Sequence, residues 1–233
     1  MYQESRGEKV FEDRREAGRE LAAAIVRRGD KYSAVLGLTR GGVPLAFEMA
    51  SALRIPMDVL VIRKLRAPNN PELAIGAVSA DGARVLREQI TRQLGVGESY
   101  MSREINLRSS EAKEEERKYR GNHTPLSVKG ASVIIVDDGI ATGASIEAAV
   151  MSARQRGARR IVVATPVASR EACTELRNVA DDVFCLTTPL DFWAVGMFYR
   201  DFSQVPDEEV VHLLDQSRSA EKKTGNNNLT SEN

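Results

Sequence analysis

Residues 133–145 read VIIVDDGIATGAS and join a predicted strand to a predicted helix through a short turn. The four β-branched residues 133–136 predict a strand that is buried on both faces, as in a parallel sheet. Asp137 and Asp138 follow at once, so both carboxylates belong at the carboxyl edge of that sheet. Ligands of open α/β sheets bind at this edge. The run therefore predicts both an element of the fold and a binding site.

The parts of this run suit the parts of a ribose 5-phosphate. Carboxylates at Asp137 and Asp138 can accept hydrogen bonds from vicinal sugar hydroxyls. The turn that follows has no bulky side chain, so a phosphate can reach main-chain N–H groups at the positive end of the helix. Hydroxyl groups of Thr142 and Ser145 add donors. An ordinary turn, with acids that cap a helix, is the alternative for either half alone.

The complete run resembles the phosphoribosyl diphosphate (PRPP) loop of the type I phosphoribosyltransferase family. Gly139 stands where that pattern usually has an aliphatic residue. The resemblance covers about residues 8–215 in layout and implies transfer of ribose 5-phosphate from PRPP to a nitrogen nucleophile, with release of diphosphate. It implies that Asp137 and Asp138 hold the ribose. It assigns the 5-phosphate to Ala141, Thr142, Gly143, Ala144 and Ser145.

A second unit of strand, glycine turn and helix lies earlier in the chain. Residues 34–38 predict a buried strand, and a helix is expected from Val43 to about Leu53. Between them, paired glycines permit close approach of a ligand, and an arginine adds a fixed positive charge. The alternative is a tight turn with an exposed arginine. The resemblance implies that this turn, Thr39, Arg40, Gly41 and Gly42, binds the diphosphate.

A basic segment follows the predicted strand 57–62. Residues 63–66 read RKLR and precede a breaker-rich segment, 67–72, while residues 74–78 and 83–86 predict a hairpin around Asp81-Gly82. Cations here could form a solvated loop or close over a diphosphate as charge builds on it. With the resemblance, we interpret the segment as a flexible lid. Its candidate catalytic residues are Lys64, Arg66 and Glu72.

The remaining segments alternate between predicted helices and strands. Helices are expected over 8–28, 145–156 and 170–176, and strands over 161–165 and 183–186. This order predicts an α/β fold with a doubly wound, mainly parallel sheet and helices on both faces. We expect a single domain over residues 1–215, a last helix over 208–214 and a disordered tail over 216–233. The charged, helical residues 98–120 project into solvent or pack on a second subunit, which would form a homodimer.

Aromatic residues gather near the C-terminal end, within a small hood expected over residues 187–202. They form either a structural mini-core or a lid that stacks on a planar ring. The resemblance favours the second interpretation. The candidate acceptor-binding residues are Phe192, Trp193, Phe198 and Tyr199.

Composition excludes several classes of partner. Lysine plus arginine and aspartate plus glutamate both number 33, so no net charge attracts nucleic acid or an anionic membrane. No apolar stretch approaches the roughly 20 residues that cross a bilayer, which predicts a cytoplasmic protein. Cys173 and Cys185 have neither a metal-binding spacing nor a disulfide framework, and we expect free thiols in the core.

The resemblance implies a PRPP-dependent pentosyltransferase of nucleotide metabolism. Its cofactor would be Mg²⁺, bound mainly through PRPP and water, because the chain offers no dedicated metal cage. Ala141 stands where the 6-oxopurine branch has an aspartate, which argues against hypoxanthine or guanine and leaves the nitrogenous acceptor open. The alternative function is a regulator that senses PRPP or nucleotides without turnover. A regulator of nucleic acid should carry a basic face, which this neutral chain lacks.

Overall fold

A five-stranded parallel sheet forms the centre of the computed structural model, which describes residues 10–227. The strand order is β2-β1-β6-β7-β8, which confirms the doubly wound sheet. After β1 the chain winds to one edge through β2, and from β6 it winds to the other, so the direction reverses between β1 and β6. Such a switch point opens a crevice at the carboxyl ends of the two strands. The strands are β1 (Ala34–Leu38), β2 (Met57–Leu60), β6 (Ser132–Val136), β7 (Arg160–Val167) and β8 (Asp182–Thr187).

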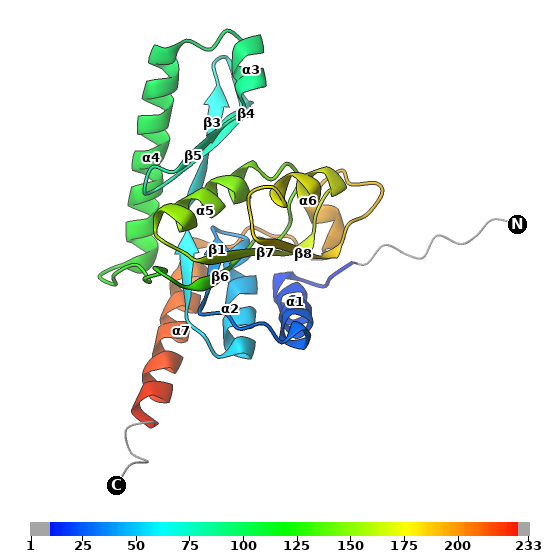
Figure 1. Ribbon diagram of the computed structural model, residues 1–233, viewed down its shortest axis with the longest axis vertical. Helices are drawn as coiled ribbons and strands as arrows, with labels where there is room; N and C mark the ends of the chain where they lie inside the picture. The colour runs from blue at the N-terminus through cyan, green and yellow to red at the C-terminus, as the bar shows by residue number, and fades with distance from the viewer. Residues whose placement is uncertain (1–9, 228–233) are drawn as a thin grey trace, which may run out of the picture.

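Helices cover both faces of this sheet (Figure 1). One face packs against α1 (Arg14–Arg28), α2 (Gly42–Leu53) and α7 (Asp207–Asn227), and the other against α5 (Ala144–Gln155) and α6 (Arg170–Leu176). Successive strand residues point to opposite faces: Val35 joins the first core and Leu36 the second. Strands buried on both faces are therefore apolar throughout, as in residues 133–136.

A separate antiparallel sheet stands away from the central one, together with the helices that follow it (Figure 1). The hairpin predicted around Asp81-Gly82 is present. Residues 63–66 do not form the solvated loop that was the alternative: they lie in a strand in which Leu65 is buried while Lys64 and Arg66 are exposed. This alternation is the period of a half-buried strand. The elements are β3 (Ile62–Ala67), β4 (Asn70–Ser79), β5 (Arg84–Leu86), α3 (Glu88–Gln93) and α4 (Glu98–Arg120).

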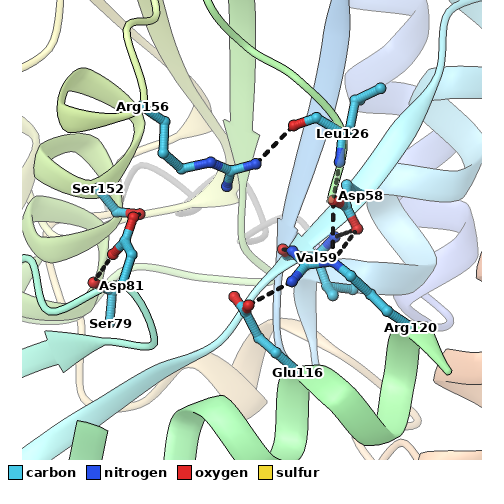
Figure 2. Close-up of polar contacts among 9 residues, drawn as sticks. All are labelled: Asp58, Val59, Ser79, Asp81, Glu116, Arg120, Leu126, Ser152 and Arg156. Atoms are coloured by element: carbon cyan, nitrogen blue, oxygen red, sulfur yellow. Dashed lines mark hydrogen bonds and ion pairs between the residues drawn. The ribbon is translucent and has the colours of Figure 1, made fainter. Parts of the chain in front are cut away.

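A buried ion pair fixes α4 to the central sheet (Figure 2). Nε of Arg120, at the end of α4, donates to both carboxylate oxygens of Asp58 on β2, at 3.0 and 3.2 Å. The Arg120 and Asp58 side chains are only 5% and 2% exposed. Arg120 also donates to the Val59 carbonyl and pairs with Glu116, while the Leu126 N–H donates to Asp58. These added hydrogen bonds offset the cost of removing both charges from water.

A second polar contact joins the small sheet to α5. Asp81, in the turn between β4 and β5, accepts a hydrogen bond of 2.7 Å from the Ser152 hydroxyl and another from Ser79 (Figure 2). On the opposite side, α4 packs along β3, where the Tyr100 hydroxyl donates to the Arg66 carbonyl at 3.0 Å. The helix expected to face solvent or a second subunit thus covers this sheet, and the homodimer stays a prediction.

The last helix is longer than the sequence predicted. α7 runs from Asp207 to Asn227, so the expected disordered tail is helical over 216–227, and residues 228–233 lie outside the described residues. As far as Ser217, the added helix continues the buried stripe of Val210, Leu213 and Leu214. Within residues 10–227, no helix is both long and apolar enough to cross a bilayer.

Candidate functional site

The turn between β6 and α5 presents an open helix N-terminus. Gly143 is the N-cap of α5 and has a φ of 75°, which favours glycine. Among the described residues no side chain caps this end, whereas Asp13 caps α1 and Ser169 caps α6. The first N–H groups of a helix have no partner within it. At α5 they are therefore suited to bind an anion.

The turn between β1 and α2 meets the first turn across the switch point. It contains a cis peptide bond between Thr39 and Arg40, and α2 starts after Gly41, with no side-chain cap in the described chain. A Cβ atom on Gly41 would lie 2.0 Å from Asp138 Oδ2, and one on Gly42 would lie 2.4 Å from the Val136 carbonyl oxygen. Only glycine allows this approach. The structure thus brings the predicted diphosphate turn against the predicted ribose acids.

The acid pair is screened from water and only partly neutralised. Asp138 Oδ2 accepts a 2.7 Å hydrogen bond from Arg14 Nε, and Asp137 accepts one of 3.0 Å from the Asp138 N–H. Burial and the neighbouring charge of Asp138 raise the pKa of Asp137 well above its ordinary value. Burial also raises the pKa of Asp138, although Arg14 opposes this shift. Hydroxyl donors of a sugar would satisfy such carboxylates.

Arg14 is a site residue that the sequence did not reveal. It belongs to the first turn of α1, and its guanidinium lies 4.0 Å from the ring centroid of Phe202 and donates to the Ser203 carbonyl. These contacts hold the guanidinium against Asp138 from outside the loop. No local pattern distinguishes Arg14 from the other charged residues of that helix, since its partners lie more than a hundred residues away.

A polar cavity of about 870 Å³ opens beside residues 141–145, the turn predicted to bind the 5-phosphate (the phosphate turn). It is bounded by Ala141 and Thr142 of the turn, by Arg87 and Glu175, and by Phe192 and Trp193 of the hood. The structure therefore brings two of the predicted acceptor residues to the predicted phosphate residues. Arg87, another residue that the sequence analysis missed, donates to the Thr142 carbonyl at 3.0 Å.

The other two predicted acceptor residues are part of the core. Phe198 is 2% exposed and stacks on Phe192 with ring centroids 5.6 Å apart, so it offers no surface to an acceptor. Tyr199 is also buried, and its hydroxyl donates to the Asp138 carbonyl at 2.6 Å. The hood is therefore a mini-core at Phe198 and Tyr199. Its Phe192 and Trp193 border the cavity that Thr142 also lines.

The hood also explains an unusual glycine in the loop. A Cβ atom on Gly139 would lie 2.2 Å from Cγ1 of Val195, which begins the short 3-10 helix η1 (Val195–Phe198). A larger residue at 139 would push η1 away from the loop. Gly139 thus allows the hood to pack directly on the residues that follow the acid pair.

The predicted basic residues lie apart from the cavity beside the phosphate turn. Lys64, Arg66 and Glu72 line a separate cavity of about 270 Å³ on the small sheet. Arg40 directs its guanidinium to Asp207 at the start of α7, at 3.3 Å. Residues 39–42, predicted to bind diphosphate, thus lie against the acid pair, while Lys64, Arg66 and Glu72 line a different cavity.

The acidic residues suit a metal ion that is bound by few protein ligands. Within the described chain, no three side chains of His, Cys, Asp and Glu are grouped to hold a cation. Mg²⁺ commonly keeps several waters and is bound through one or two carboxylates plus substrate phosphates. The adjacent Asp137 and Asp138 fit an ion of this kind, which would arrive with a diphosphate.

Comparisons with known proteins agree on one family. The family model for the phosphoribosyl transferase domain matches residues 11–202. Relatives from two strains of Mycobacterium tuberculosis, provisionally named phosphoribosyl transferases, are 43% identical over 209 residues. These matches cover 90% of this chain and 47% of each relative, so the chain spans about half of their length. A crystal structure of a Thermus thermophilus protein is 44% identical with a TM-score of 0.76, over 89% of this chain and 98% of that one.

Proposed function

Because this chain belongs to the phosphoribosyl transferase family, we propose that it transfers ribose 5-phosphate from PRPP to a nitrogenous acceptor and releases diphosphate. One observation carries the proposal: two glycine turns, each at a helix N-terminus that no side chain of the described residues caps, meet at a half-buried acid pair on the switch point. Two anion sites that flank two sugar-binding carboxylates are what a ribose with a phosphate and a diphosphate requires.

The proposed roles follow the order of groups along PRPP. N–H groups of residues 141–145 bind the 5-phosphate, Asp137 and Asp138 accept hydrogen bonds from the ribose hydroxyls, and residues 39–42 bind the diphosphate. Mg²⁺, when bound, neutralises part of the diphosphate charge. Cleavage of the bond from the anomeric carbon to the diphosphate leaves positive charge on the sugar. The chain contributes by positioning the reactants and by placing fixed charges around them.

The screen that tests this function measures diphosphate release from PRPP with Mg²⁺ across candidate nitrogenous acceptors. We expect release that depends on one acceptor class, together with the matching ribonucleotide as product. PRPP binding without release for every acceptor would favour the regulator instead. Absence of PRPP binding would reject both functions. EDTA should abolish turnover, because the diphosphate would then lack its counter-charge.

We further propose that the small sheet closes over bound PRPP and brings Lys64 to the diphosphate. Lys64→Ala should then lower kcat by about 10–100-fold while changing PRPP affinity less, because the charge acts mainly as the leaving group forms. Steady-state kinetics and calorimetry measure the two effects. Lys113→Ala, on the exposed side of α4, is the matched control and should change neither quantity. Equal losses of affinity and kcat would indicate simple anchoring by Lys64.

Trp193 is proposed to select the acceptor. Its side chain is 83% exposed at the rim of the cavity that Thr142 also lines, so it is free to stack on a planar ring. Trp193→Ala should raise the KM for the acceptor by about 5–100-fold, since base–aromatic stacking contributes about 1–3 kcal/mol, and should leave PRPP affinity unchanged. Leu190→Ala removes an equally exposed side chain of the hood and should alter neither. A parallel loss of PRPP affinity would contradict this role.

A further inference from the structure

The two cysteines of the chain, whose spacing predicted no disulfide, lie next to each other in the structure. Cys173 lies on α6 and Cys185 on β8, and their sulfur atoms are 2.6 Å apart although both are free thiols. Cys173 is buried, whereas Cys185 is partly exposed. The pair therefore joins two neighbouring elements, and Cys185 is its more exposed member.

The surroundings favour thiolate chemistry at this pair. A hydrogen bond from Cys185 lowers the pKa of Cys173, and the positive charge of Arg177 acts in the same direction. The same hydrogen bond and burial raise the pKa of Cys185, so Cys173 is the more acidic member of the pair. A thiolate beside an arginine and next to a second thiol is the arrangement that reacts by thiol–disulfide exchange.

The helix that carries Cys173 is also bonded to the phosphate turn. Ser169, the N-cap of α6, donates through its hydroxyl to the Ala141 carbonyl at 2.8 Å, and its N–H donates to the Ile140 carbonyl at 2.9 Å. At the other end of α6, Leu176 packs against Gly143: a Cβ atom on Gly143 would lie 3.5 Å from Cγ of Leu176. A covalent bond at Cys173 would thus restrain α6, the helix that packs against the phosphate turn.

We propose that Cys173 and Cys185 form a dithiol modification site that a small-molecule disulfide such as oxidised glutathione converts into an intramolecular disulfide. One cysteine of the pair attacks the oxidant as its thiolate, forms a mixed disulfide and releases one glutathione thiolate. The other cysteine then loses its proton, attacks the protein sulfur of the mixed disulfide and releases the second glutathione thiolate. The two protein thiols lose their protons and two electrons, and the oxidant is reduced to two glutathione thiols. The bond ties α6 to β8.

Thiol labelling tests this site without any assumption about PRPP. The reduced chain is treated with oxidised glutathione under native conditions, then denatured, alkylated with a maleimide and weighed by mass spectrometry. We expect both cysteines to be labelled before oxidation and neither after it, with a mass that has lost two hydrogen atoms and a monomeric band on a non-reducing gel. Reduction should restore both labels.

Single variants separate the internal bond from other products. Cys173→Ser and Cys185→Ser each retain one thiol, which should stay free or carry one glutathione, because the internal partner is missing. Two free thiols after oxidation of the unchanged chain, a glutathione on each cysteine, or a linkage between two chains would each overturn the proposal. Failure here would leave the PRPP screen unaffected, since that screen is run on the reduced chain.

Discussion

Asp138→Asn is expected to weaken PRPP binding by about 10–100-fold, measured by calorimetry with Mg²⁺ present. Hydrogen bonds to a charged group contribute about 1.5–3 kcal/mol each, and the substitution removes the charge while keeping the size of the side chain. The effect should be large because Asp138 is mostly buried, where solvent screens little, and because Arg14 and Gly41 fix its position. Asp137→Asn should act in the same direction. The double variant should lose more PRPP affinity than either single variant.

The control for this prediction is Asp30→Asn. Asp30 precedes β1 at the amino ends of the strands, whereas the proposed site lies at their carboxyl ends. The control therefore changes the same kind of carboxylate away from the proposed site. PRPP affinity should be unchanged in this variant. Circular dichroism should show the same helix content in both variants. If Asp138→Asn and Asp30→Asn bind PRPP equally well, the acid pair has no role in holding the ribose.

Asp58→Asn is expected to lower the free energy of unfolding by about 3–5 kcal/mol, measured by urea denaturation. Removing the charge of one partner in a buried ion pair leaves the other charge poorly compensated, and Arg120 would then keep the ion pair with Glu116 and the hydrogen bond to the Val59 carbonyl. Burial raises the pKa of Glu116, the carboxyl that would remain paired with Arg120. The free energy of unfolding of a native domain is only about 5–15 kcal/mol. The loss should therefore also raise the fraction of molecules in which α4 is detached from the central sheet.

An exposed ion pair of the same kind supplies the comparison. Asp182 pairs with Arg28 where both side chains are about a third exposed, and Asp182→Asn should cost less than about 1 kcal/mol. A double variant, Asp58→Leu with Arg120→Met, should recover part of the loss, because it removes both buried charges. Similar losses for Asp58→Asn and Asp182→Asn would show that burial does not govern the Asp58–Arg120 pair.

The sequence by itself determined the parts of this protein whose signals lie in contiguous residues. The apolar run 133–136 and the small-residue turn after it specify a strand and a helix within one segment, because side-chain size and local backbone preference act between neighbours. The alternation of strands and helices likewise fixed the doubly wound sheet. The Asp81-Gly82 turn fixed its hairpin.

Only the tertiary structure decided which distant side chains meet. Arg14 reaches Asp138 across 124 residues, Arg120 reaches Asp58 across 62, and Cys173 meets Cys185 from a different element. Tertiary packing also buries Phe198 and Tyr199 in the core and leaves Trp193 exposed at the rim of the cavity. The physical reason is that such contacts depend on how sheets and helices pack, which no local pattern of charge or hydrophobicity encodes.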